Sequence, residues 1–225
     1  MSRLHHRQTA QLCQALASPP RLHLLNLLAQ CPWTVGELAS ETGGSIASVS
    51  AHLKPLRTSG LIESEKVGRE VFCQVKAPEV FELLSTASRV AETLDPSLRE
   101  AGRIADEDPY LYRETDMDRL IRDVRDAQIH LLDFRTEREF HHGHVPGAQS
   151  LPFTQLSKNS IDRFDPQRPA VGYCRGPWCA KALESVETLN DFGLPTQRLR
   201  LGVLEWRASV GDLTPGDSYP DPSLS

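Results

Sequence analysis

The apolar residues of the first 94 positions recur every three or four residues, which is the period of helices with one buried face. They are Leu12, Leu16, Leu22, Leu25, Leu28, Val35, Leu38, Val49, Leu53 and Leu56. Ser18 before Pro19 is typical of a helix N-terminus, and the pair Gly43-Gly44 breaks the pattern. The chain is therefore expected to form short, closely connected helices, the last of them over residues 45–58.

Beyond this helix the period changes to two, which is the period of a strand with one buried face. Residues 61–67 and 70–75 are β-prone and only Gly68-Arg69 separates them, so they predict a hairpin with a tight turn. Residues 78–94 return to helical spacing and carry a wide apolar stripe. This order is typical of a winged helix-turn-helix, and the stripe predicts a partner for the last helix.

Residues 95–114 are charged and weakly periodic, and they contain the breakers Asp95-Pro96 and Asp108-Pro109. We therefore expect a linker between two domains there. The expected boundaries are 1–94 for the first domain, 95–114 for the linker, 115–211 for the second domain and 212–225 for a disordered tail.

In the second domain, helical and β-prone segments alternate. Helices are expected over 116–125 and 180–192, and strands over 129–134, 171–173 and 199–201. Such alternation predicts a parallel sheet with helices on both faces. The predicted fold is thus a mainly-α winged helix-turn-helix followed by an α/β domain.

The net charge of −5 is unevenly distributed along the 225 residues. Through residue 95 there are nine Lys and Arg against nine Asp and Glu, and the remainder holds sixteen against twenty-one. A basic surface is therefore expected only in the first half. No apolar run is long enough for a membrane span and the N-terminus lacks the pattern of an export signal, so we expect a cytoplasmic protein without a membrane partner.

The predicted helix 45–58 has the position of a recognition helix, because it precedes the hairpin. Its apolar residues are expected to face the core, which directs its polar face toward DNA. The candidate DNA-binding residues of the helix and hairpin are Ser45, Ser48, Ala51, His52, Lys54, Arg57, Lys66 and Arg69. Pro55 is expected to bend this helix near Ala51.

The first domain resembles the ArsR-type repressors over about residues 9–92. The resemblance is carried by Ala15–Leu22, Val35–Ala39, Ser48–Leu53 and Ser59–Ile62. It implies a homodimer, formed by the first and last helices of the domain, on double-stranded operator DNA. The alternative is that the same helices and hairpin bind another protein.

Many ArsR relatives sense metals, but the corresponding stretches here do not carry suitable ligands. Residues 34–36 contain no cysteine, and residues 78–94 contain neither cysteine nor histidine. No metal is expected at those two places. Cys13 and Cys31 are candidate thiol sensors, as is Cys73, and the alternative for each is a small core residue.

Cys174 follows a short apolar strand and begins a loop that contains Gly176 and Pro177 and leads to the helix expected near Ala180. Loop N–H groups and a helix N-terminus are expected to surround the sulfur, to lower its pKa and to hold a persulfide on it. Arg175 adds charge nearby. Trp178 and Cys179 complete this candidate catalytic loop.

The second domain resembles the rhodaneses over residues 115–210. The resemblance is carried by Leu131–Arg135, Gly143–Ala148, Gly172–Cys179 and Gly202–Trp206. It implies that Cys174 takes a sulfane sulfur from a small donor, which is thiosulfate, a polysulfide or a low-molecular-weight persulfide, and that no cofactor is needed. Asp133 and Arg135 are expected to brace the loop. A metal site at His141, His142 and His144 is disfavoured, since such close imidazoles converge poorly on one ion.

Cys179 departs from the rhodanese pattern, which usually has Arg, Ser or Thr there. It can accept sulfur from Cys174, close a disulfide with it, or only pack beneath the loop. Leu201 replaces a usual glycine. Ala180 stands where cysteine-loop phosphatases and arsenate reductases need arginine, so their chemistry is disfavoured.

The fusion of the two signatures leads to one main hypothesis and two alternatives. The chain is expected to be a DNA-binding transcriptional regulator, a repressor, whose second domain carries or senses persulfide sulfur at Cys174. The first alternative is a sulfurtransferase that uses the first domain mainly to dimerise. The second is an inactive rhodanese that serves as a ligand-sensing module.

Overall fold

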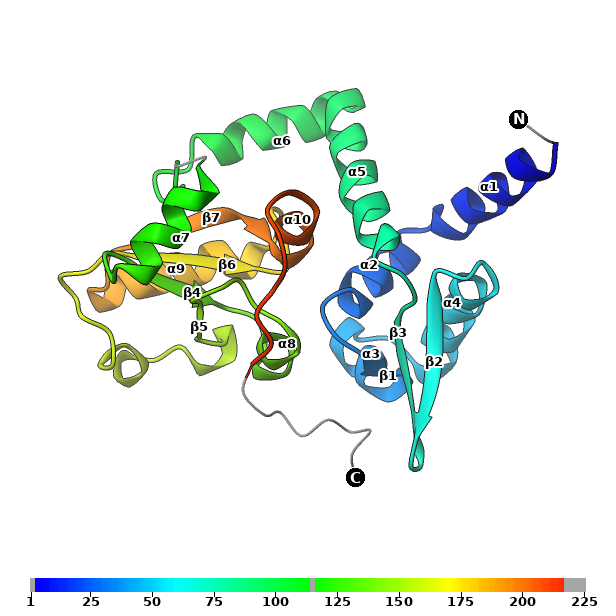
Figure 1. The fold of residues 1–225 in the computed structure, drawn as a ribbon, viewed down its shortest axis with the longest axis horizontal. Coiled ribbons are helices and arrows are strands. Elements are labelled where there is room, and N and C mark those ends of the chain that lie inside the picture. Colours follow the sequence, from blue (N-terminus) through cyan, green and yellow to red (C-terminus); the bar gives the residue numbers. More distant parts are fainter. Residues whose placement is uncertain (1–2, 114–115, 217–225) are drawn as a thin grey trace. The chain divides into compact units, whose positions relative to one another are not determined.

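The computed structural model describes residues 3–113 and 116–216 (Figure 1). The chain forms two compact units, of which the first ends at Leu84 and the second begins at Ser85. The division falls inside the helix predicted over residues 78–94. Within the described residues, no helix combines the length and the apolar character needed to cross a bilayer.

The first unit is mainly helical with one small antiparallel sheet, in the order β1-β3-β2. Its elements are α1 (Arg3–Leu16), α2 (Pro19–Leu28), β1 (Trp33–Thr34), α3 (Val35–Thr42), α4 (Ile46–Thr58), β2 (Ile62–Val67), β3 (Glu70–Val75) and the start of α5 (Glu79–Leu94). The predicted helices and hairpin are confirmed. The two-residue strand β1 was not predicted, because it is too short to show a period.

Local side-chain chemistry explains where α3 and α4 begin and end. Thr34 and Glu37 form a capping box at the start of α3, and Gly43 ends that helix with a positive φ of 66°. Ser45 then accepts a hydrogen bond from the backbone N–H of Ser48 and caps α4. The helix α4 runs to its end through Pro55.

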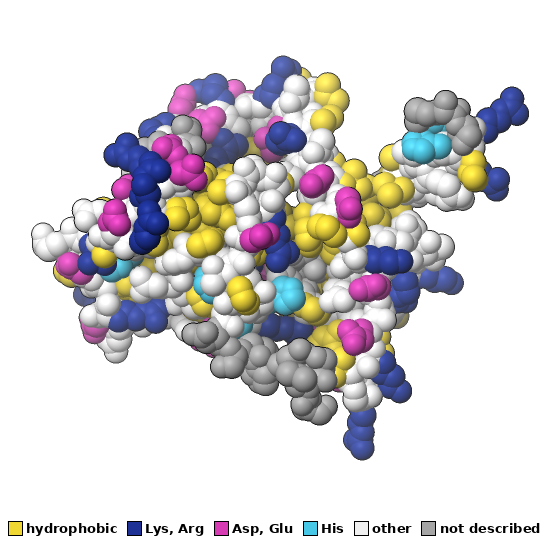
Figure 2. All heavy atoms as spheres, in the orientation of Figure 1, with side chains coloured by type: hydrophobic (Ala, Val, Ile, Leu, Met, Phe, Trp, Pro, Cys, Tyr) yellow, Lys and Arg dark blue, Asp and Glu magenta, His cyan; other side chains and the backbone are white. Residues whose placement is uncertain are grey.

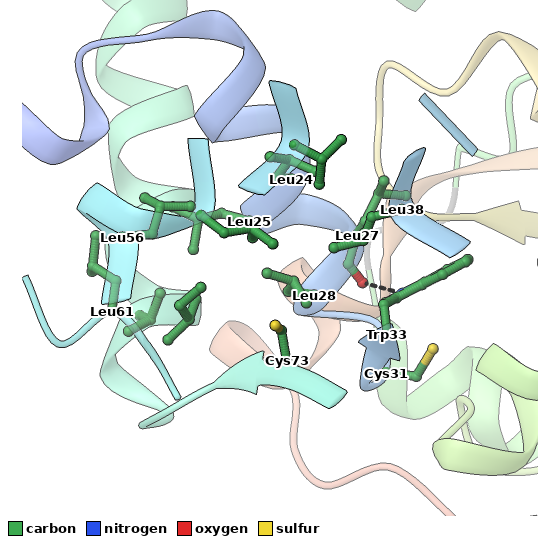
Figure 3. Close-up of a cluster of buried hydrophobic side chains, with 14 of the residues drawn as sticks. Leu24, Leu25, Leu27, Leu28, Cys31, Trp33, Leu38, Leu56, Leu61 and Cys73 are labelled. Atoms are coloured by element: carbon green, nitrogen blue, oxygen red, sulfur yellow. Dashed lines mark hydrogen bonds between the residues drawn. The ribbon is translucent and has the colours of Figure 1, made fainter. Parts of the chain in front are cut away.

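A leucine-rich core joins these helices to the hairpin (Figure 3). The labelled side chains Leu25, Leu28, Leu56 and Leu61 lie close together, and Cys73 reaches them from β3. The helix α1 contributes little to this core, because Ala15 is the one residue of α1 that is buried. The apolar stripe of α5 is buried only at its start: Val80 is buried, whereas Leu94 is 73% exposed.

The second unit contains a parallel sheet in the order β5-β4-β6-β7, which confirms the predicted α/β fold. Its elements after α5 are α6 (Pro96–Asp106), α7 (Met117–Arg125), β4 (His130–Asp133), α8 (Glu137–His142), β5 (Gln149–Ser150), the short helices η1 (Phe153–Gln155) and η2 (Lys158–Ile161), β6 (Ala170–Cys174), α9 (Ala180–Phe192), β7 (Thr196–Gly202) and α10 (Val203–Ser209).

Helices cover both faces of this sheet, as the sequence predicted (Figure 1). Leu132 of β4 packs in one core with Val186 of α9, whereas its neighbour Leu131 packs in another with Leu120 of α7 and Trp206 of α10. The two cores follow from the strand geometry, because successive side chains point to opposite faces.

The described residues of the predicted linker belong to the second unit and are held within it by ion pairs. Asp95 caps α6 with its carboxylate. Arg200 of β7 pairs with Asp106, and Arg198 pairs with Asp108 at 3.1 Å. The chain that follows α6 is therefore held along β7 by ion pairs.

The prediction of a disordered tail over residues 212–225 is wrong for its first residues. Thr214 and His144 exchange backbone hydrogen bonds of 2.8 and 2.9 Å, and Leu213 packs against Gly143. These contacts order residues 213 and 214, although the polar composition of the tail predicted disorder. Residues 217–225 of the predicted tail lie outside the described residues.

A buried ion pair holds the end of β4. The Arg135 guanidinium donates to both carboxylate oxygens of Asp133 and to the Gly143 carbonyl, and neither charged side chain of the pair is exposed. The Tyr173 hydroxyl donates to Asp133 at 2.7 Å and accepts from the N–H of Val145 at 3.0 Å. This network, formed by Asp133, Arg135 and Tyr173, connects β4, β6 and the turn at residues 143–145.

Loss of one partner in this network is expected to cost far more than loss of a surface ion pair. Asp133→Ala leaves the Arg135 charge buried and uncompensated, so the free energy of unfolding should fall by about 3–5 kcal/mol. Tyr173→Phe removes one hydroxyl and should cost about 1–3 kcal/mol. Urea unfolding measures both, with Asp126→Ala, at an exposed pair with Arg125, as a control that changes stability by less than about 0.5 kcal/mol. Equal effects in Asp133→Ala and the control would contradict this.

Candidate functional site

The candidate DNA-binding residues lie on α4 and on the β2–β3 hairpin, and His52 among them is half-buried while the others are exposed. Val49, Leu53 and Leu56 are buried on the opposite face of α4, as predicted. Figure 2 shows Lys and Arg atoms along the hairpin and at its tip. The first unit thus exposes the polar face of α4 and the basic tip of the β2–β3 hairpin.

Arg57 differs from the other basic residues of this surface, because its guanidinium bonds within the unit. It donates to the Ser64 hydroxyl at 3.0 Å and to the Cys73 sulfur at 3.7 Å. These contacts tie the end of α4 to both strands of the hairpin. A contact between Arg57 and a phosphate would have to replace them.

The three cysteines of the first unit lie in different surroundings. Cys13 is exposed on α1, whereas Cys31 and Cys73 are buried in the core. The Cys73 sulfur also lies 3.4 Å from the Ser64 hydroxyl. None of these three cysteines forms a disulfide in this structure.

The second unit brings two cysteines into contact. Cys174 ends β6 and Cys179 is the N-cap of α9, so residues 174–179 form a short loop between strand and helix, which we call the cysteine loop. The two sulfur atoms lie 2.8 Å apart. Cys174 is only 4% exposed, and Cys179 is half-buried.

The lowered thiol pKa expected at Cys174 falls on Cys179 instead. The hydrogen bond between the two sulfur atoms lowers the pKa of Cys179 to about 6, and backbone N–H groups of Ala182, Arg175 and Lys181 act in the same direction. The same contact and burial raise the pKa of Cys174. The prediction placed the helix N-terminus correctly, but the sulfur nearest to it belongs to Cys179.

The cysteine loop is anchored by residues that the sequence did not single out. Arg175 donates to both carboxylate oxygens of Glu139, at 2.7 and 3.1 Å, and the Glu139 side chain is fully buried. Burial raises the pKa of Glu139, but the Arg175 bonds outweigh this and lower it. The signal for Glu139 in the sequence was the capping-box spacing from Thr136. The Arg175 charge is therefore neutralised within the protein.

Two further contacts position the cysteine loop. Arg198 donates to the Pro177 carbonyl at 3.2 Å, and the Trp178 indole N–H donates to Glu92 at 2.8 Å. Gly202 lies against the loop backbone, because a Cβ there would be 2.5 Å from the Arg175 carbonyl. A side chain at position 202 would displace the loop.

A half-buried carboxyl group lies near the loop at Glu205. One of its oxygens accepts from the N–H of Gly202, and burial raises its pKa. A Cβ placed on Gly176 would lie 3.9 Å from both Glu205 oxygens. An acidic group thus faces the middle of the loop.

Asp133 and Arg135 lie in the buried network, which Tyr173 connects to the cysteine loop, because Tyr173 precedes Cys174. His144 is buried, stacks on Phe140 with ring centres 3.8 Å apart and bonds the Phe140 carbonyl; burial lowers its pKa. Within residues 3–113 and 116–216, no three His, Cys, Asp or Glu side chains are grouped to hold a metal.

The arrangement of the two thiols predicts that alkylation follows the ionisation of Cys179. The rate of modification by iodoacetamide, followed from about pH 4 to 9, should rise with a midpoint near the pKa of about 6, and peptide mapping should find the label on Cys179. Cys174→Ala removes the side-chain hydrogen bond that lowers the pKa of Cys179, so the midpoint should move up toward the ordinary value of 9.0. A label mainly on Cys174 in the wild type would overturn the assignment.

Comparison with known proteins relates both units to families. Residues 116–209 match the rhodanese-like domain, and residues 18–64 match the bacterial regulatory proteins of the arsR family. Among solved structures, the chain is similar to a homodimeric winged helix-turn-helix DNA-binding domain, a fragment of Mb0332 from Mycobacterium bovis. The identity is 31%, the TM-score is 0.40, and the match covers 42% of this chain and 92% of the fragment.

Two curated relatives are transcriptional regulators. YgaV of Escherichia coli is 34% identical over 84 residues, which are 37% of this chain and 85% of that protein. Rv0324 of Mycobacterium tuberculosis, an HTH-type transcriptional regulator, is 31% identical over 202 residues, which are 89% of this chain and 87% of that protein. Because that match extends through both units, the chain belongs to the ArsR-type helix-turn-helix transcriptional regulators that carry a rhodanese-like domain.

Proposed function

We propose that this transcriptional regulator is a homodimeric repressor that binds operator DNA in the cytoplasm and senses persulfide sulfur at Cys174. The observation that carries the proposal is the contact between Cys174 and Cys179 at 2.8 Å in the same chain as a winged helix-turn-helix. Two thiols this close can form a persulfide or a disulfide when a sulfane sulfur reacts with them, and small thiols can reduce either product again.

The candidate DNA contacts divide into two kinds. Ser45, Ser48 and Ala51 lie exposed on α4, where a helix in the major groove meets base edges. Lys54, Lys66 and Arg69 are exposed cations suited to phosphates. Base contacts then select the operator, and phosphate contacts hold the protein on it.

Dimerisation is proposed through α1 and α5, whose apolar residues remain exposed. Leu4 of α1 and Val90 and Leu94 of α5 belong to the large apolar side chains at the surface. Apolar stripes on helices are stable when a second helix covers them. A second copy of the chain offers the same two helices.

A link from the cysteine loop to α5 supports a sensing role. The Trp178 side chain, at the tip of the loop, bonds Glu92, which lies on α5 within the same compact unit. A loop that changes shape when its cysteines react would strain or release this bond. The state of the thiols is thereby connected to a helix proposed for the dimer.

The direct test measures binding to DNA upstream of the protein's own gene, with and without inorganic polysulfide. Polysulfide should weaken binding by the wild type at least about tenfold. Cys174→Ser should bind DNA normally and not respond. Cys13→Ser, which changes an exposed cysteine outside the loop, is the matched control and should respond like the wild type. A response that survives in Cys174→Ser, or that is lost in Cys13→Ser, argues against sensing at Cys174.

The phosphate contacts make a separate prediction about salt. Each cation lost from the interface reduces the number of released counterions, so Arg69→Ala should lower the slope of log affinity against log salt by about one. Arg125→Ala, at an exposed cation on α7 of the second unit, should leave the slope unchanged. Anisotropy of a labelled duplex across several salt concentrations measures both. Identical slopes for wild type and Arg69→Ala would remove the hairpin tip from the interface.

A further inference from the structure

A groove of about 570 Å³ opens beside the cysteine loop, wholly within the second unit. Ala101, Ile104 and Ala105 of α6 line one side, and Pro177 and Trp178 of the loop line it as well. Its size lies within the range of small-molecule sites. Because α6 precedes the residues that match the rhodanese-like domain, 116–209, this wall is an addition to that domain.

Large apolar side chains line the groove and remain exposed to solvent. Ile104, Trp178 and Leu183 all line it and remain 57%, 42% and 37% exposed. Large apolar side chains gathered around one hollow, rather than scattered singly, are typical of a binding site. These side chains favour a ligand with an aromatic or alkyl group.

Cys179 lines this groove, and Cys174 does not. Cys174 lies deeper, nearly fully buried, with its sulfur 2.8 Å from that of Cys179. A molecule in the groove therefore meets Cys179 first. Of the two thiols, Cys179 is also the one whose pKa is lowered, by its contact with Cys174 and by N–H groups of the loop and of α9.

The charges around the groove disfavour a small dianion. The Asp, Glu and Arg residues that line it are Glu107, Asp108, Glu187 and Arg198, and Arg198 is already paired with Asp108. The ammonium of Lys181, in the first turn of α9, lies over the Phe153 ring. With the Arg175 charge neutralised by a buried carboxylate, thiosulfate would meet more negative than positive charge.

We propose that the sulfur donor is a small organic persulfide, R–S–SH, whose apolar R group lies in the groove, that Cys179 is the first nucleophile, and that Cys174 resolves the product as a disulfide. This deepens the proposed function and rests on it, since it names the donor and the order of events at the same pair of cysteines.

The two steps balance. In the first, the Cys179 thiolate attacks the outer sulfur of R–S–SH; a new S–S bond forms, the old one breaks, and R–S⁻ leaves, which makes Cys179–S–SH. In the second, the Cys174 sulfur attacks the Cys179 Sγ; the disulfide forms, the outer sulfur leaves as HS⁻ and takes the Cys174 proton to give H₂S. The sulfane sulfur is reduced and the two cysteine sulfurs are oxidised.

The test treats the reduced full-length protein with benzyl persulfide and measures released sulfide and peptide masses. The wild type should release one sulfide per chain and lose two hydrogens at Cys174 and Cys179. Cys174→Ser should release none and gain one sulfur atom on Cys179, because the resolving thiol is missing. Cys179→Ser should do neither at a comparable rate. Sulfur added first to Cys174, or equal sulfide release from Cys174→Ser, overturns the order of events.

A groove variant tests the donor independently of the cysteines. Ile104→Glu places a charge at an exposed groove position and should slow the reaction with benzyl persulfide roughly tenfold, while leaving iodoacetamide alkylation unchanged. Leu98→Glu, on the same helix but not lining the groove, is the matched control and should react like the wild type. Thiosulfate should react more slowly than benzyl persulfide with the wild type.

The outcomes separate this inference from the proposed function. Equal rates for Ile104→Glu and Leu98→Glu, or faster reaction with thiosulfate, would exclude the groove as the donor site. If polysulfide still releases DNA only when Cys174 is present, the sensing function then stands without it. Loss of that DNA response with the sulfide chemistry intact would overturn the sensing function and leave the thiol chemistry in place.

Discussion

The buried pair of Arg135 and Asp133 is the constraint on which the second unit depends. A charge without access to water is stable in a protein only when it is paired and its remaining donors are bonded. The pair meets this demand by engaging the Gly143 carbonyl and the Tyr173 hydroxyl. The strand β6 is thereby held in register at Tyr173, and Cys174 follows directly after it. The position of the reactive loop is thus set by a bond network that does not touch the sulfur.

Around the loop, the protein places its charges so that they act on the thiols and less on an incoming anion. The one guanidinium of the loop is bound by buried Glu139, and the protonation of Glu205 is favoured by burial. The groups that lower the pKa of Cys179 are the Cys174 side chain and backbone N–H groups, which carry no net charge. Such surroundings favour a thiolate without adding a full positive charge that would attract anionic donors, which agrees with the apolar groove next to it.

The cysteine pair bears on whether the rhodanese-like domain of this regulator is suited to turnover or to sensing. An enzyme that turns over needs its persulfide to be accessible to an acceptor, whereas Cys174 is buried beneath Cys179. In the proposed mechanism, the pair converts an incoming sulfur atom into a bond between two chain positions, which is suited to a signal. The Trp178–Glu92 bond would connect that signal to α5.

The sequence by itself determined the order of the elements, the recognition helix with its hairpin, the parallel sheet and the loop that carries Cys174 and Cys179. These follow from periodicity, caps and turn residues, which act over a few residues and can be read along the chain. Tertiary structure alone decided which thiol has the lowered pKa, since this depends on which sulfur meets the N-terminus of α9. It also paired Arg175 with Glu139, 36 residues away, and held the end of α6 and the residues after it along β7 through Arg200 and Arg198. Ion pairs and burial depend on the distance between residues in space, and this distance cannot be predicted from their spacing along the chain.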